Sequence, residues 1–153
     1  MRALYAIRVI FVSLEFLVLA LSFAGWFLFF DYISDFVLGN SLNEKAVEWI
    51  LLYPVSIAVW VIKEAGSVLF PSERMDSILH EWDGYWKLRV HYNTGLFYCV
   101  APVVPCFYIW LMGFISKPLG LWVFLTCSMV SSVSAFSFYQ ANIRLKEILI
   151  KGL

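Results

Sequence analysis

The sequence contains few charged residues and no excess of either sign. Charged residues make up 14% of the 153 residues, and 11 basic residues are balanced by 11 acidic ones. Soluble proteins carry charge on about a quarter of their residues, and proteins that bind nucleic acid through bulk charge have a basic excess. The composition therefore excludes a soluble enzyme domain, a disordered tail and a nucleic-acid-binding protein of that kind. We expect no direct contact with nucleic acid.

Sequence motifs typical of catalytic, phosphate-binding or metal-binding sites are also scarce. The sequence has no Ser-His-Asp ordering, no glycine-rich phosphate loop and no paired carboxylates. Side chains of the types that bind metals gather near the middle of the chain, but their spacing fits no metal motif: His80, Glu81, Asp83 and His91. We expect no enzyme activity, no cofactor and no metal. The three cysteines lie in apolar runs, where we expect free thiols: Cys99, Cys106 and Cys127.

Apolar residues are what the sequence has in abundance. They make up 62% of the chain, and the mean hydropathy is +0.81. A helix of about 20 apolar residues crosses a hydrocarbon core of about 30 Å. The uncharged runs therefore predict an all-α membrane protein, in which residues 1–153 form a single domain with four transmembrane helices. The expected spans are about 10–30, 46–62, 96–115 and 119–139, with a loop at 63–95 and a tail at 140–153.

The distribution of Lys and Arg predicts the orientation of these spans, because cytoplasmic loops are enriched in both residues. If the N-terminus is cytoplasmic, only Lys45 and Lys117 lie outside. Nine basic residues then lie inside: Arg2, Arg8, Lys63, Arg74, Lys87, Arg89, Arg144, Lys146 and Lys151. We therefore expect both termini to be cytoplasmic, together with an amphipathic inner loop and a short helical tail.

The fourth predicted span is rich in small residues. Ser128 and Ser132 lie four residues apart, as do Ser131 and Ala135. Small residues at this spacing let helix backbones approach closely, so we interpret them as a helix-packing seam, with the lining of a polar cavity as the alternative. Bends are expected where prolines remove backbone donors inside spans: Pro54, Pro102 and Pro105.

Glu15 is the ionisable residue that we expect to lie well inside a span. It follows Arg8 by seven residues, which places it about 10 Å into the first helix. Its candidate partners are Arg8, two turns away on the same face, or hydroxyl groups from another helix. An intramembrane carboxyl is a functional candidate by default. It either stabilises the bundle as a protonated or hydrogen-bonded group, or exchanges protons or cations with a substrate.

A four-helix chain with a glutamate early in its first helix is similar to the small multidrug resistance transporters. The resemblance rests on Glu15 and the number of helices. The chain departs from that family in lacking its glycine pattern around the glutamate, and in having an inner loop and a tail.

The inner loop and the tail carry the residues that we expect to contact a partner protein. Met75, Leu79 and Trp82 share one face of a predicted loop helix. The following segment, 85–92, alternates apolar with basic residues, which indicates an interfacial stretch or, as the alternative, a short strand. The candidate contact residues are Met75, Leu79, Trp82, Trp86, Lys87, Arg89, Arg144 and Lys151. The apolar stripe of the tail either lies on the membrane or loop, or docks the partner.

Three functions remain open from these patterns. The first is a small multi-pass subunit of a plasma membrane of the bacterial inner-membrane type, which oligomerises in the lipid bilayer and anchors or signals to a cytosolic protein. By size and topology the chain resembles a membrane component of a phage-defence system, for instance the four-helix subunit of Kiwa. The second is an oligomeric channel or transporter coupled to protons or cations through Glu15. The third is an immunity protein that blocks a pore-forming toxin through helix contacts in the membrane.

Overall fold

The computed structural model describes residues 2–39, 44–69 and 84–151, and all its secondary structure there is helical. The elements in chain order are α1 (Arg2–Phe11), α2 (Leu14–Gly39), α3 (Glu44–Leu69), α5 (Tyr85–Val100), α6 (Val103–Met112), the short 3₁₀ helix η1 (Phe114–Ser116) and α7 (Pro118–Lys151). Four segments are long and apolar enough to cross a membrane: Leu14–Gly39, Trp49–Gly66, Tyr85–Met112 and Pro118–Ile143. The predicted all-α, multi-pass membrane architecture is therefore confirmed.

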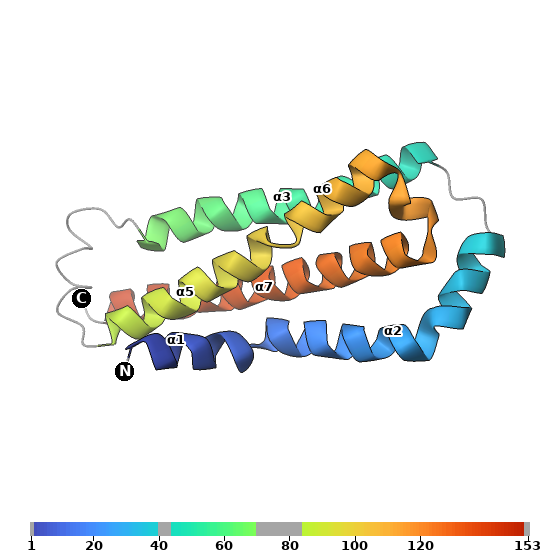
Figure 1. The fold of residues 1–153 in the computed structure, drawn as a ribbon. Helices are drawn as coiled ribbons and strands as arrows, with labels where there is room; N and C mark the ends of the chain where they lie inside the picture. The colour runs from blue at the N-terminus through green and yellow to red at the C-terminus, as the bar shows by residue number, and fades with distance from the viewer. Residues whose placement is uncertain (1, 40–43, 70–83, 152–153) are drawn as a thin grey trace.

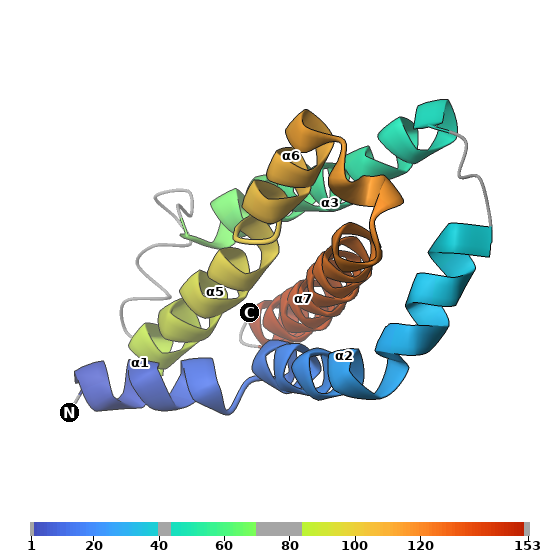
Figure 2. The same cartoon turned by 45° about the vertical axis from the view of Figure 1, so that its right-hand side comes forward.

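The helix α7 lies at the centre of the bundle. It packs against α2, α3, α5, α6 and η1, while α1 packs against α5 (Figures 1 and 2). The start of α1, the end of α3, the start of α5 and the end of α7 lie together at one end of the molecule (Figure 1). We call this the basic end, because Arg8, Lys63, Lys87 and Arg89 belong to these segments. The opposite end, where η1 lies, is called the far end.

The first span begins and ends later than the sequence predicts. The helical conformation is interrupted at Val12 and Ser13. The next helix, α2, then runs from Leu14 to Gly39 instead of the expected 10–30. Ser13 causes the break by capping the new helix, since its Oγ accepts a hydrogen bond of 3.1 Å from the backbone N–H of Phe16. The helix also continues beyond residue 30, where the exposed side chains of Asp31 and Asp35 need no buried partner.

The third span is two helices rather than one. It starts at Tyr85 and is interrupted at Ala101 and Pro102, so the expected bounds of 96–115 and a loop reaching residue 95 are wrong. The helix α6 starts after Pro102, because the proline ring fixes a helical φ and has no N–H to leave unpaired. The segment 85–92 is helical, which rules out the strand alternative.

The second and fourth spans also exceed their expected bounds of 46–62 and 119–139. The helix α3 extends from Glu44 to Leu69 and continues through Pro54 without interruption. The helix α7 runs on to Lys151, so the predicted helical tail is continuous with the fourth span as far as that residue. At about 1.5 Å per residue its 34 residues reach about 51 Å, well beyond the hydrocarbon core.

Two clusters of buried residues hold the bundle together. The one near the basic end joins Val61 of α3, Cys99 of α5 and Phe138 of α7. The one near the far end joins Leu51, Cys106 and Cys127, among others. In the first cluster α5 approaches α7 so closely that a Cβ on Gly95 would lie 2.7 Å from the Phe138 ring. All three cysteines are buried and carry free thiols.

Candidate functional site

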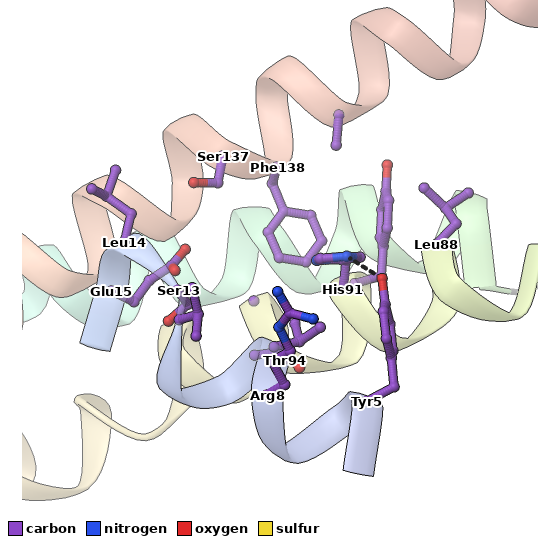
Figure 3. Close-up of a pocket in the computed structure, with 15 residues that line it drawn as sticks. Tyr5, Arg8, Ser13, Leu14, Glu15, Leu88, His91, Thr94, Ser137 and Phe138 are labelled. Carbon is purple, nitrogen blue, oxygen red and sulfur yellow. Dashed lines mark hydrogen bonds between the residues drawn. The ribbon is translucent and has the colours of Figure 1, made fainter. Parts of the chain in front are cut away.

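A cavity of about 790 Å³ opens near the basic end, between α1, the start of α2, α5 and α7 (Figure 3). Its walls are largely apolar and aromatic, and polar side chains reach into it from four helices: α1, α2, α5 and α7. The polar lining consists of Tyr5, Arg8, Ser13, Glu15, His91, Tyr92, Thr94 and Ser137. A volume of this size is typical of sites that hold a small organic ligand rather than an ion.

Glu15 is the most deeply buried charged residue of this lining. It is only 6% exposed, and Figure 3 shows its carboxylate directed from the start of α2 toward α7, on the side of Ser137. Glu15 is the second residue of α2, because Ser13 starts a new helix just before it, so Glu15 does not lie about 10 Å into a helix as the sequence predicts. A carboxylate in the first turn is favoured by the helix dipole.

Arg8, one of the candidate partners named from the sequence, lines the same cavity without reaching Glu15. The guanidinium of Arg8 points into the cavity from α1 (Figure 3). Among the described residues, neither Arg8 nor Glu15 has a hydrogen-bond or ion-pair partner for its side chain. Two opposite charges therefore face one cavity without neutralising each other.

Tyr5 ties α1 to α5 at the edge of this cavity. Its hydroxyl and Nε2 of His91 are joined by a hydrogen bond of 3.0 Å, and its ring packs edge-on against Trp86 at a centroid distance of 5.1 Å. The Nζ of Lys87 lies 5.8 Å from the centre of the Trp86 ring. The wall of the cavity and the start of α5 are thus in direct contact.

A buried polar network below the cavity was missed from the sequence. Tyr92 donates a hydrogen bond of 2.6 Å to Oδ1 of Asn142, and Nδ2 of Asn142 donates one of 3.4 Å to Glu64. The network joins α5, α7 and α3. Asn142 and Glu64 both lie at the ends of apolar runs, where a polar residue is unremarkable, so their sequence positions alone do not indicate that they meet.

The expected partner-binding residues are only partly described. Met75, Leu79 and Trp82 lie outside the described residues, as do the side chains of Arg144 and Lys151 on the last turns of α7. Lys87 and Arg89 are exposed on α5. Trp86 is half-buried and packs on Tyr5, so it belongs in part to the wall of the cavity.

The small residues of α7 occupy its contacts with the other helices. Ser131 is 0% exposed, and Ala135 packs against the cluster near the basic end. The hydroxyl of Ser132 donates to the backbone oxygen of Ser128 and also shares a hydrogen bond of 3.0 Å with Tyr53 of α3. Three buried Oγ atoms have no hydrogen-bond partner among the described residues: those of Ser128, Ser131 and Ser134.

Comparison with protein-family models, with curated proteins and with solved structures finds no match to this chain. The geometry of the cavity and of the basic end is therefore what bears on function.

Proposed function

We propose that this chain is a small multi-pass subunit of a plasma membrane of the bacterial inner-membrane type, which oligomerises and anchors or signals to a cytosolic protein, as in a phage-defence assembly. The observation that carries the proposal is the gathering of exposed basic side chains, Lys87 and Arg89 among them, at the end where α7 extends past its apolar span. Basic residues face the cytoplasm in membrane proteins. The basic end is accordingly assigned to the cytoplasm.

The contact between the start of α5 and α1 gives this end a route for a signal. Trp86 packs on Tyr5 of α1, and Tyr5 is hydrogen-bonded to His91 at the cavity. A partner that engages Lys87 and Arg89 would therefore press on the same helix turn that forms the cavity wall. A change in the cavity and a change in the bound partner are then coupled through α1.

The outward face of α2 supports oligomerisation. This helix contacts α7 through Ser22, which is hydrogen-bonded to Thr126, and through Trp26. On its opposite face Ala20 and Ala24 are exposed and lie one turn apart. Small residues four apart permit close approach of helices in a membrane, so this face is the proposed contact between copies.

The partner is tested by capturing the tagged full-length chain from its host in a gentle detergent and weighing the intact complex. We expect a stoichiometric cytosolic protein with the native chain. Replacing both exposed cations, Lys87→Ala with Arg89→Ala, should lower its retention by about tenfold or more, because Arg side chains are frequent hot spots of interfaces. Trp86→Ala is a poorer test, since it also removes the packing on Tyr5.

The control is Lys117→Ala, which removes an exposed cation that follows η1 at the far end, away from the basic end. Its retention of the partner should equal that of the native chain. A bare oligomer from the native chain, or equal loss in the control, contradicts the anchoring function.

A second function, transport of protons or cations, is favoured by one observation. Glu15 is buried, has no described partner and lines a cavity. In liposomes containing the purified chain, Glu15→Gln should then abolish flux and leave the oligomer intact, with Asp35→Asn as the control at an exposed carboxylate. Flux that persists in Glu15→Gln excludes this function.

A further inference from the structure

The charges in the cavity are balanced but unpaired. Glu15 supplies a buried carboxylate from α2 and Arg8 supplies a guanidinium from α1, and both reach into one space of about 790 Å³. A buried carboxylate without a partner is costly in an apolar setting. The two groups form no ion pair with each other although only a short break separates their helices. This arrangement is suited to a ligand that carries both charges.

The level of the cavity in the membrane further restricts the class of ligand that can bind there. Glu15 lies at the start of the α2 span, which begins at Leu14. Phe138 and Ala141 line the cavity from the last two turns of the α7 span, which ends at Ile143. Taking these two span ends as the level where lipid headgroups meet the acyl chains, the cavity lies at that level. Its remaining walls are apolar and include Val9, Val12, Leu14 and Leu88.

We propose that this cavity binds a glycerophospholipid whose headgroup carries both a phosphate and a primary ammonium, as in phosphatidylethanolamine. Arg8 holds the phosphate, Glu15 accepts hydrogen bonds from the ammonium, and the apolar wall takes the glycerol end of the acyl chains. Lipid binding at this site does not require the cytosolic partner, because it needs only lipid and the chain itself.

Simpler ligands fit the same residues less well. A bare cation leaves most of the volume empty and meets the positive charge of Arg8. A free anion meets the negative charge of Glu15. A small soluble zwitterion would match both charges but would leave the apolar walls without contacts. A zwitterionic lipid satisfies the two charges and the walls together.

The test measures lipid retention by the full-length chain. The protein is exchanged in mild detergent against equal amounts of dioleoyl-phosphatidylethanolamine, -phosphatidylglycerol and -phosphatidylcholine, and bound lipid is counted by native mass spectrometry. We expect one bound phosphatidylethanolamine per chain and about tenfold less phosphatidylglycerol. The latter lacks the ammonium from which Glu15 would accept hydrogen bonds. Phosphatidylcholine should fall between them, because its quaternary ammonium keeps the charge but has no N–H.

Two variants assign the two charges separately. Glu15→Gln should remove the preference for phosphatidylethanolamine over phosphatidylglycerol. Arg8→Gln should weaken the binding of phosphatidylethanolamine and phosphatidylglycerol by a similar factor, since both lipids have the phosphate. The controls are Asp35→Asn and Lys63→Gln, which remove one exposed charge of each sign outside the cavity lining and should change nothing.

The comparison of headgroups in the native chain tests the proposed lipid site even if a variant fails to assemble. Equal retention of phosphatidylethanolamine and phosphatidylglycerol by the native chain overturns the proposal. So does an unchanged preference in a folded Glu15→Gln variant. Loss of the cytosolic partner with retained lipid preference would contradict the anchoring function alone and leave the lipid site standing.

Discussion

The helices α2 and α7 are both long enough and apolar enough to cross a membrane, but they differ in how much of their surface the rest of the protein buries. In the α7 span, 33% of the most apolar stretch is buried in the protein, against 6% in α2. The helix α7 turns small side chains such as Ser131 and Ser134 toward its neighbours. The helix α2 turns large ones outward, with Leu28 79% exposed.

The difference shows what decides helix position in this bundle. Lipid solvates leucine and phenylalanine as well as a protein core does. Large apolar side chains alone therefore do not favour a central position for a helix. Small side chains let backbones approach and gain dispersion contacts that lipid cannot provide. The central helix of a small membrane protein is therefore the one with the small residues, here α7.

The largest effect should come from adding the same bulk to each helix. Ser131→Leu forces a side chain into a position that is 0% exposed, and we expect a loss of about 3 kcal/mol in the free energy of unfolding. Ala24→Leu adds similar bulk on the exposed face of α2. It should leave the fold intact and dissociate the proposed oligomer.

Unfolding in mild detergent, followed by circular dichroism, and the mass of the complex separate these two results. Ser56→Leu, on an exposed position of α3, is the control that should alter neither. If Ala24→Leu unfolds the chain as Ser131→Leu does, α2 and α7 are not used differently.

A middle-sized effect is expected for the polar network that ties α7 to α5. Tyr92→Phe removes the donor to Asn142 and leaves a buried acceptor unpaired. We expect the free energy of unfolding to fall by about 1–2 kcal/mol. Tyr139→Phe removes a hydroxyl from a side chain that is 53% exposed, so it should have no effect and serves as the control. Equal stability of the two variants would show that the hydrogen bond contributes nothing.

The smallest effects compare two neighbouring serines of α7. Ser131→Ala removes a buried hydroxyl that has no partner, so the melting temperature should stay the same or rise. Ser132→Ala removes a hydroxyl that bonds to Ser128 and Tyr53, so it should lower the free energy of unfolding by about 1 kcal/mol. Thermal unfolding of both variants in the same detergent makes the comparison. The reverse order would mean that Ser131 has a partner in the membrane.

The sequence predicted the number and type of the membrane helices because hydrophobic length reports directly on the bilayer thickness. It did not predict where they start. Ser13 ends one helix and caps another, a local hydrogen bond that hydropathy does not register. Similarly, α5 starts at Tyr85 in a segment whose alternating basic and apolar residues resemble an interfacial stretch.

The candidate site was predicted in part. Glu15 stood out because carboxylates are rare in apolar runs, and helix spacing made Arg8 one candidate partner. The structure brings both to one cavity but does not pair them. Tyr5, His91 and the network of Tyr92 with Asn142 depend on how α1, α5 and α7 meet, which no local pattern encodes.

The unbroken length of α7 also has a mechanical consequence. The helix runs from Pro118 to Lys151 with no proline after its first residue, whereas α5 and α6 are separated by a break at Ala101 and Pro102. A rigid rod transmits a tilt or a rotation from one side of a bilayer to the other, and a jointed one absorbs it. The chain thus combines one continuous helix with one interrupted helix, and α7 is the element suited to carry a tilt from the far end to the basic end.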